Sequence, residues 1–221
     1  MSKDEIINKA VYIQYPINFN SYNSSYKKEN IIKLPLPKKN EMYSGWSKNS
    51  NHFTTEYHRL YSLPTLNKLL NFNFNINHFN LKHQTCNNFD ISMLYPKNNF
   101  KFEIYGYSRN EHFDNLTYDD LMKNNSKGSD ITEYHRLYKY GHECSRVINK
   151  STNNGKLLFI SGDSQMIPDI PVLCCYYKEV WYFDNRYRVK LCDKFKDVNF
   201  DQVLIQLNNN SITKYLNENF Y

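Results

Sequence analysis

Residues 155–186 read GKLLFISGDSQMIPDIPVLCCYYKEVWYFDNR, and they carry the clearest signals of secondary structure in the chain. Residues 157–160 are a continuous apolar run, which is typical of a strand that is buried on both faces of a parallel sheet. The apolar content of residues 170–177 predicts a buried helix, and residues 179–184 predict the next strand. Strand, helix and strand in this order predict an α/β fold, a three-layer sandwich with a mostly parallel sheet.

The whole chain of 221 residues suits one domain with a sizeable core. We expect residues 1–50 to be an irregular N-terminal segment, residues 51–150 to be an insert, and residues 151–221 to be the α/β part. Further strands are predicted at residues 11–15, 31–36, 101–107 and 201–207, and further helices at residues 65–72, 116–123 and 211–219.

Composition and charge restrict the classes of protein to which the sequence can belong. The formal net charge is +6, but lysine and arginine form no dominant cluster, so we do not expect nucleic-acid binding. The charge indicates either a mildly basic surface or attraction to an anionic substrate such as a sugar phosphate. The start of the chain is polar, no stretch approaches membrane-spanning length, and the five cysteines do not resemble a disulfide framework. We therefore expect a cytoplasmic protein without a membrane span.

The buried strand at residues 157–160 leads into the tripeptide Gly162-Asp163-Ser164. Open α/β sheets place their sites at the carboxyl ends of the strands. Gly162 permits a tight turn with an unusual φ angle, and the following helix offers backbone N–H groups that can hold an oxyanion. Ser164 is therefore a candidate nucleophile, which needs a base that is itself oriented by a carboxylate. The alternative is that Asp163 or Ser164 only caps the helix.

A second candidate element occurs twice, because residues 55–61 and residues 132–138 both read TEYHRLY. Each copy contains a Glu-x-His pair. The two pairs are Glu56 with His58 and Glu133 with His135. In an extended segment, side chains two positions apart lie on one face, so the glutamate can hold the histidine tautomer that a base requires. Alternatively, the repeat packs its tyrosine and leucine side chains into the core.

Residues 155–186 resemble the nucleophile segment of the SGNH-like O-acetyltransferases that modify bacterial polysaccharides, the alginate acetyltransferase group. That group places an acid-x-His element upstream of its GDS and ends the next strand in Asp-x-Arg, which residues 184–186, Asp-Asn-Arg, match. The stretch HFTTEYHRLY at residues 52–61 matches the acid-x-His element loosely, with Glu56 in place of Asp and Arg59 in place of Trp. The resemblance implies an SGNH-hydrolase-like, flavodoxin-like fold. It also implies a serine-dependent acyltransferase or esterase that acts on a carbohydrate of a capsule, a lipopolysaccharide or another cell-surface glycan.

The resemblance also assigns the candidate catalytic residues. We favour His58 as the base that takes the proton of Ser164, with Glu56 as the carboxylate that orients the imidazole. The long separation between His58 and Ser164 suits the group. Glu133 with His135 stays the second candidate pair.

Substrate binding is expected from residues around these elements. The developing oxyanion would be held by the backbone N–H of Ser164 and by Gln165. Arg186 would hold an anionic part of the donor or the acceptor. The candidate substrate-binding residues are Asp163, Gln165, Arg186, Arg59 and Arg136. We expect no cofactor and no metal, because the cysteines lack a paired spacing and the histidines lack the helical spacing of a zinc site.

Two other classes of function stay open. One is the transfer of a phosphoryl-type group to a capsule sugar on the same fold, which the basic charge and the two arginine-bearing repeats suit. The other is a non-catalytic glycan-binding module, in which the serine would reach no histidine. The expected partners are therefore a carbohydrate or nucleotide-sugar substrate and an acyl or phosphoryl-type donor, without nucleic acid.

Overall fold

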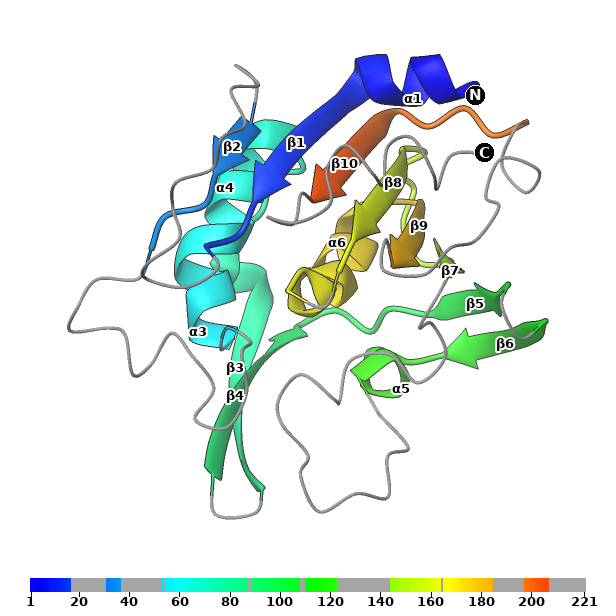
Figure 1. Ribbon diagram of the computed structural model, residues 1–221. Coiled ribbons are helices and arrows are strands. Elements are labelled where there is room, and N and C mark those ends of the chain that lie inside the picture. The colour runs from blue at the N-terminus through cyan, green and yellow to red at the C-terminus, as the bar shows by residue number, and fades with distance from the viewer. Residues whose placement is uncertain are drawn as a thin grey trace.

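A sheet of eight strands runs through the part of the chain that the structure describes (Figure 1). The structure is a computed structural model and describes residues 1–16, 31–36, 53, 55–86, 89–107, 110–122, 144–163, 165–184 and 197–206. In spatial order the strands are β2 (Ile31–Lys33), β1 (Ala10–Gln14), β10 (Gln202–Gln206), β8 (Leu157–Gly162), β9 (Glu179–Asp184), β7 (Cys144–Asn149), β5 (Phe102–Gly106) and β6 (Glu111–Leu116).

The strands from β2 to β9 in this order pair in parallel, and β7, β5 and β6 continue the sheet as an antiparallel ladder. In the parallel part, Leu157 pairs with Glu179 and Gly162 pairs with Asp184. The carboxyl ends of β1, β10, β8 and β9 therefore lie at one edge of the sheet. The predicted α/β fold with a mostly parallel sheet is confirmed, and this edge is where such folds place their sites.

Two helical pieces join β8 to β9, the 3₁₀ turn η5 (Ile167–Asp169) and helix α6 (Ile170–Tyr176). Each piece carries a proline in its first turn, where the missing N–H costs no helical hydrogen bond. The helix ends at Tyr177, which is extended with φ −111° and ψ 148°. The strand, helix and strand predicted within residues 157–184 are therefore confirmed.

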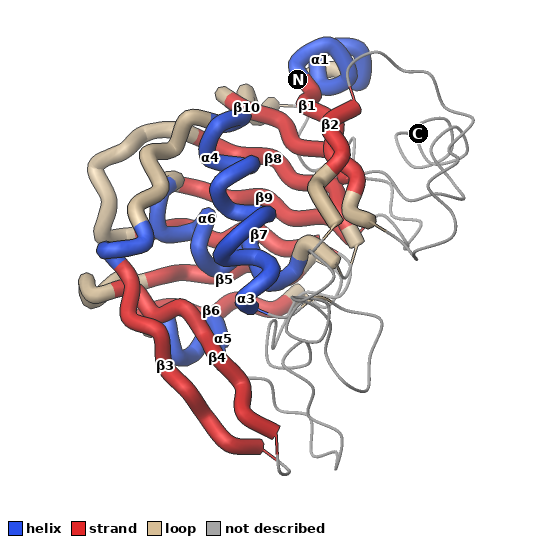
Figure 2. Tube along the Cα trace, turned by 90° about the vertical axis from the view of Figure 1, so that its left-hand side faces the viewer, coloured by secondary structure: helices blue, strands red, loops and turns tan. Residues whose placement is uncertain are grey.

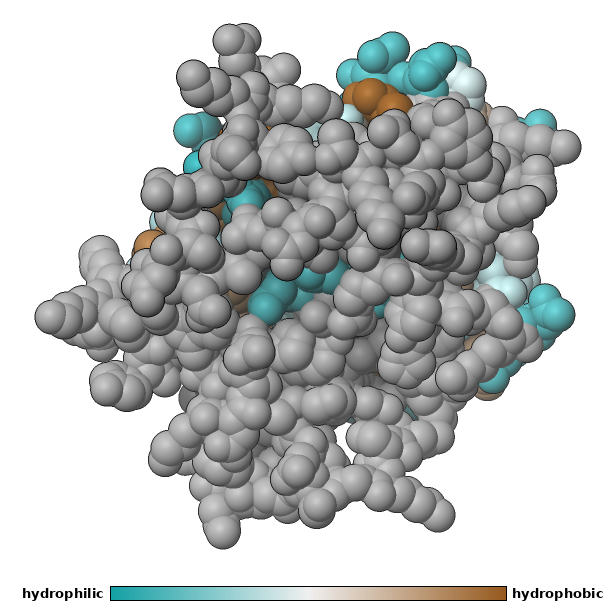
Figure 3. Space-filling model, viewed as in Figure 1, coloured by the Kyte–Doolittle hydropathy of each residue, from teal (hydrophilic) through white to brown (hydrophobic). Residues whose placement is uncertain are grey.

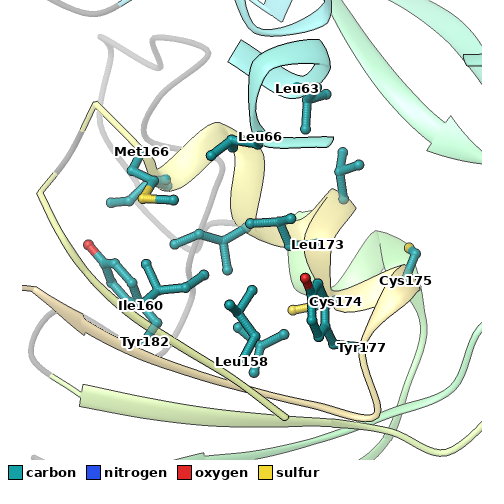
Figure 4. Packing of buried hydrophobic residues seen from close by; sticks show 14 of the residues in the cluster. Leu63, Leu66, Leu158, Ile160, Met166, Leu173, Cys174, Cys175, Tyr177 and Tyr182 are labelled. Carbon is teal, nitrogen blue, oxygen red and sulfur yellow. The ribbon is translucent and has the colours of Figure 1, made fainter. Parts of the chain in front are cut away.

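Side chains of β8 and β9 alternate between two apolar clusters, one on each face of the sheet. Those that face α6 and the larger cluster are Leu158, Ile160, Val180 and Tyr182 (Figure 4). Those that face the second cluster are Phe159, Trp181 and Phe183. The second cluster also holds Ile6 of helix α1 (Lys3–Lys9). Because both faces are covered, residues 157–160 of β8 and residues 180–183 of β9 are apolar at every position instead of at every second one.

Residues 55–70 form a helical segment that covers the same face of the sheet as α6 (Figure 2). It consists of α3 (Thr55–Tyr57), the π-helical turn η2 (His58–Ser62) and α4 (Leu63–Leu70). Leu63, Leu66 and Leu70 follow the helical spacing and are buried. The segment ends at Asn71, whose left-handed φ of 47° is typical of a helix C-cap. The helix predicted at residues 65–72 is confirmed, although it starts earlier.

The expectation that residues 1–50 are irregular is wrong at their start. Helix α1 begins with a capping box, in which the Ser2 hydroxyl accepts from the Glu5 N–H and the Glu5 carboxylate accepts from the Ser2 N–H. Ile6 is buried, while the rest of the sequence KDEIINK is mainly polar, and the surface around α1 is mostly hydrophilic (Figure 3). A short helix is stable here because a cap and one apolar anchor support it. The strands predicted at residues 11–15 and 31–36 are β1 and the shorter β2.

The middle of the chain adds a second, two-stranded sheet. It is formed by β3 (Phe79–Cys86) and β4 (Phe89–Pro96), which pair antiparallel and follow the 3₁₀ turn η3 (Ile76–His78). Helix α5 (Tyr118–Met122) lies within the predicted helix at residues 116–123, and β5 and β10 within the other two predicted strands. The helix predicted at residues 211–219 lies outside the described residues. No described helix is long and apolar enough to cross a membrane.

Candidate active site

The turn that carries Ser164 in the sequence is closed by the side chain of its neighbour Asp163. The Gln165 N–H donates to Asp163 Oδ1 at 2.8 Å, and the Met166 N–H donates to the Asp163 carbonyl oxygen at 3.1 Å. A side-chain oxygen that accepts from the N–H two positions later is the hydrogen bond of an Asx turn. Ser164 itself lies outside the described residues. The N-cap residues of η5 and α6 are Met166 and Asp169, and neither side chain makes a capping bond, so the alternative in which Asp163 is the N-cap is wrong, while the same alternative for Ser164 stays a prediction.

Gln206, the last residue of β10, holds the same turn from the neighbouring strand. Its amide Nε2 donates to Asp163 Oδ1 at 2.5 Å, and the Asp163 N–H donates to Gln206 Oε1 at 3.0 Å. The carboxylate of Asp163 therefore accepts hydrogen bonds from the protein itself. The Gln165 N–H, which donates to that carboxylate, is likewise engaged in the turn and not directed at an oxyanion.

Gly162 is required because the Gln206 side chain passes close to its Cα. The expected reason, an unusual φ angle at Gly162, is wrong. No glycine among the described residues has a positive φ. A Cβ atom on Gly162 would lie 2.9 Å from Gln206 Oε1 and 3.2 Å from Met166 Sδ. The glycine thus lets Gln206 reach the Asp163 backbone.

His58 is the buried histidine of the site, at 2% exposure, and its partner is Asp169. His58 Nδ1 lies 3.0 Å from Asp169 Oδ1, although 111 positions separate the two residues in the sequence. Asp169 is the last residue of η5 and is completely buried. A buried carboxylate and a buried imidazole in contact form the base and the orienting acid of many hydrolytic sites.

The expectation that Glu56 orients His58 is wrong in this geometry. It assumed an extended segment, whereas residues 55–62 are helical. Residues two positions apart in a helix lie about 200° apart around the axis, so they do not share a face. Glu56 instead binds Arg59 one turn later, with Arg59 Nε donating to Oε2 at 2.8 Å and Nη2 donating to Oε1. The Glu56 bond raises the pKa of Arg59.

The second oxygen of Asp169 receives two hydroxyl groups that the sequence analysis did not identify. Ser62 Oγ donates to Asp169 Oδ2 at 2.5 Å, and the Tyr15 hydroxyl donates to the same oxygen. The two hydroxyl oxygens lie 2.8 Å apart. Ser62 follows His58 by four positions, so reading the segment as a helix would have placed both on one face. No pattern in the sequence connects Tyr15 to them.

The imidazole of His58 is held between aromatic rings. Tyr57 stands edge-on to it with centroids 5.7 Å apart, and Phe53 and Tyr15 lie at 6.5 Å and 6.0 Å. Nε2 of His58 is buried and has no hydrogen-bond partner among the described residues. Because a carboxylate only accepts, the neutral imidazole in this contact carries its proton on Nδ1 and has its lone pair on Nε2. Such a nitrogen can accept a proton from a substrate or a nucleophile.

The other candidates are placed as follows. Ser164, Arg186, Glu133, His135 and Arg136 lie outside the described residues, so their predicted roles stay predictions. Gln165 is half-buried beside the turn, and Arg59 is bound to Glu56. Among the described residues, no group of three or more His, Cys, Asp and Glu side chains is arranged to hold a metal ion.

The fold is shared with solved structures of low sequence identity. PatB1 of Bacillus cereus, in a structure with a sulfonyl adduct, has a TM-score of 0.68 and 14% identity, over 94% of this chain and 85% of that one. A second PatB1 structure gives a TM-score of 0.68 and 14% identity, over 94% and 86% of the two chains. A DHHW family protein from Eubacterium siraeum has a TM-score of 0.58 and 12% identity, over 94% and 83%. No protein-family model and no curated protein matches the sequence. The predicted fold class is confirmed by these likenesses.

Proposed function

We propose that this protein is a serine-dependent acyltransferase or esterase that acts on a carbohydrate, with Ser164 as the nucleophile and His58 as the base. One observation carries the proposal. At the carboxyl edge of the parallel strands, a buried histidine is paired to a carboxylate through Nδ1 while its Nε2 has no partner among the described residues.

The serine turn and the acid belong to one short segment of the chain. Residues 163–169 run from the Asx turn through Met166 to η5, and hydrogen bonds hold both ends of the segment. Gln206 binds Asp163 at the first end, and His58 binds Asp169 at the other. Ser164 lies between these two ends in the sequence, so the proposal places the nucleophile and the acid that orients the base on one short segment held at both ends, as covalent catalysis requires a fixed separation between nucleophile and base.

In the proposed reaction, His58 Nε2 takes the hydroxyl proton of Ser164 as Oγ attacks the acyl carbon. The tetrahedral intermediate then expels the donor group, which takes the proton from Nε2 and leaves an acyl-serine. A sugar hydroxyl, or water in an esterase, attacks the acyl-serine and gives its proton to Nε2, and this proton returns to Ser164 as the product leaves. Asp169, in place of Glu56, stabilises the imidazolium formed in both steps. The backbone N–H of Ser164 is our candidate oxyanion donor.

Two further points support the proposal. The PatB1 structure carries a sulfonyl adduct, and sulfonyl groups attach to activated nucleophilic side chains such as serine. The resemblance of residues 155–186 to polysaccharide O-acetyltransferases favours a carbohydrate of a cell-surface glycan as the acyl acceptor. Arg186 is our candidate for binding an anionic part of the donor or the acceptor.

The first TEYHRLY copy is the better source of the base. In that copy Ser62 follows the repeat and binds the acid, whereas Lys139 stands at the corresponding position after the second copy. A lysine cannot replace a hydroxyl of this size in a closed site. We therefore propose His58, and not His135, as the partner of Ser164.

The test is hydrolysis of p-nitrophenyl acetate by the wild type and by Ser164→Ala, His58→Ala and His135→Ala variants. Intact mass is measured on each protein after treatment with the acetyl ester, with a sulfonyl fluoride and with a fluorophosphonate. We expect turnover and adducts in the wild type and in His135→Ala, and neither in Ser164→Ala or His58→Ala. A fluorophosphonate adduct on Ser164 without any acetyl turnover would favour phosphoryl-type transfer instead. Absence of every adduct would favour a glycan-binding module.

A further inference from the structure

The two oxygens of the Asp169 carboxylate have different partners. Oδ1 faces His58 Nδ1, and Oδ2 receives the hydroxyl groups of Tyr15 and Ser62. All four side chains are buried. Each hydroxyl has one proton, so at most two of the three contacts among Tyr15, Ser62 and Oδ2 are hydrogen bonds at one moment. Every such arrangement leaves a donor on Oδ2.

These partners come from three separate parts of the chain. Tyr15 follows the last residue of β1, His58 and Ser62 are the first and last residues of the π-helical turn η2, and Asp169 ends η5. Single π-helical turns occur frequently at functional sites. Here the turn directs an imidazole and a hydroxyl to the two oxygens of one carboxylate.

A buried carboxylate without further donors has two equivalent ways to meet an imidazole, and its second oxygen would be left without a hydrogen bond. Such an oxygen is costly, so the group would take up a proton, and could then donate to Nδ1, or would admit water. Donors on Oδ2 remove these alternatives. Burial, followed by the nearby Asp169, raises the pKa of Tyr15 well above its ordinary value, so its hydroxyl keeps its proton.

We infer that Tyr15 and Ser62 are positioning residues that hold Asp169 with Oδ1 toward His58 and thereby keep His58 in the tautomer protonated at Nδ1. The inference rests on the proposed function for its effect on rate, because that tautomer is the one whose Nε2 can take the Ser164 proton. Neither hydroxyl needs to touch the substrate. Their loss should therefore lower kcat and leave KM nearly unchanged.

The first experiment reads the tautomer directly and does not depend on activity. ¹⁵N spectra of the histidine side chains are recorded for the wild type, Tyr15→Phe, Ser62→Ala and the double variant, with His58 identified by its loss in His58→Gln. We expect a protonated Nδ1 and an unprotonated Nε2 in the wild type. In the double variant we expect a mixture of the two tautomers.

Two matched controls separate this effect from loss of a buried hydroxyl in general. Tyr177→Phe removes the hydroxyl of a buried tyrosine, between α6 and β9, that donates to Gln202 Oε1. Ser145→Ala removes a completely buried serine hydroxyl on β7 that has no hydrogen-bond partner among the described residues. Both controls should keep the wild-type tautomer and the wild-type kcat.

The second experiment measures kcat and KM for p-nitrophenyl acetate in the same variants. Loss of one hydrogen bond to a charged group corresponds to about a tenfold fall in kcat for each single variant, and the double variant should lose about a hundredfold, less than Asp169→Asn, because it keeps the negative charge. A double variant that keeps one tautomer and a kcat within about twofold of the wild type would overturn the inference. If the double variant does not fold, the two single variants decide by the same criteria. If the wild type has no esterase activity, the proposed function fails, while the ¹⁵N spectra still decide the role of the hydroxyls.

Discussion

Asp169→Asn is the substitution that separates this site most sharply from the one expected from the repeat. The change keeps the size of the side chain and removes one acceptor and the negative charge. In the folded protein two hydroxyl donors meet one end of the carboxylate, and His58 meets the other. The asparagine amide will therefore direct its oxygen to Tyr15 and Ser62 and its NH₂ group to His58 Nδ1.

The expected loss of activity follows from that orientation. An NH₂ group facing Nδ1 requires the proton to move to Nε2, so His58 cannot take a proton from Ser164. To restore the productive tautomer, the amide must rotate, so that its NH₂ group faces the donors Tyr15 and Ser62. This rotation loses about 1–1.5 kcal/mol for each of the two hydrogen bonds, so about one molecule in a hundred has the productive tautomer. Loss of the negative charge beside the imidazolium should lower kcat/KM by a further factor of about 10 to 100. We expect kcat/KM to fall by about 10³ to 10⁴.

Glu56→Gln is the matched control for this substitution. Glu56 is 31% exposed and is paired with Arg59 three positions later, a kind of ion pair that contributes about 0.3–0.5 kcal/mol in a helix. We therefore expect kcat/KM for p-nitrophenyl acetate within about twofold of the wild type and little change in Tm. The reasoning is refuted if Asp169→Asn keeps a tenth of the wild-type kcat/KM, or if Glu56→Gln loses as much as Asp169→Asn.

Three further substitutions test the support of the site and of the fold. In Gly162→Ala, the added methyl would lie 2.9 Å from Gln206 Oε1, so we expect a loss of about 1–3 kcal/mol in the free energy of unfolding and a fall in kcat; an unchanged urea midpoint would contradict this. Leu66→Ala removes a completely buried side chain of α4, and the free energy of unfolding in the same urea titration should fall by about 2–5 kcal/mol. A loss below about 1 kcal/mol would argue against the packing described. Arg146→Ala removes the two hydrogen bonds from Arg146 on β7 to Glu179 on β9 and the contact of Arg146 with the Trp181 ring. The free energy of unfolding should fall by about 1 kcal/mol and kcat should not change. A loss of activity without a loss of stability would show that the antiparallel part of the sheet belongs to the site.

Much of the fold could be predicted because its signals are local. The run LLFI at residues 157–160 and the run VWYF at residues 180–183 are apolar at every position, which only strands covered on both faces need to be. The capping box at Ser2 was an equally local signal that the sequence analysis did not use. The antiparallel ladder of β7, β5 and β6 could not be predicted, since strand pairing between distant segments leaves little trace in either segment alone.

The same difference between local and long-range signals applies to the candidate site. His58 and the Gly162-Asp163-Ser164 tripeptide could be singled out because a residue type and its immediate neighbours carry the signal. The carboxylate could not be identified from the sequence, because the pairing of His58 with Asp169 spans 111 positions. A Glu two positions before the histidine was the wrong choice once the segment proved helical, since that spacing turns the two side chains to different faces.

By itself, the sequence determined the central strand, helix and strand and the place of the serine turn after a buried strand, because apolar periodicity and a tight turn are properties of adjacent residues. The acid that faces His58 and the hydroxyls that face that acid became known only from the packing of the folded chain. Tyr15, Ser62 and Asp169 meet because β1, η2 and η5 end beside one another at the carboxyl edge of the sheet. Their contacts depend on how the chain packs and not on how far apart the residues stand along it.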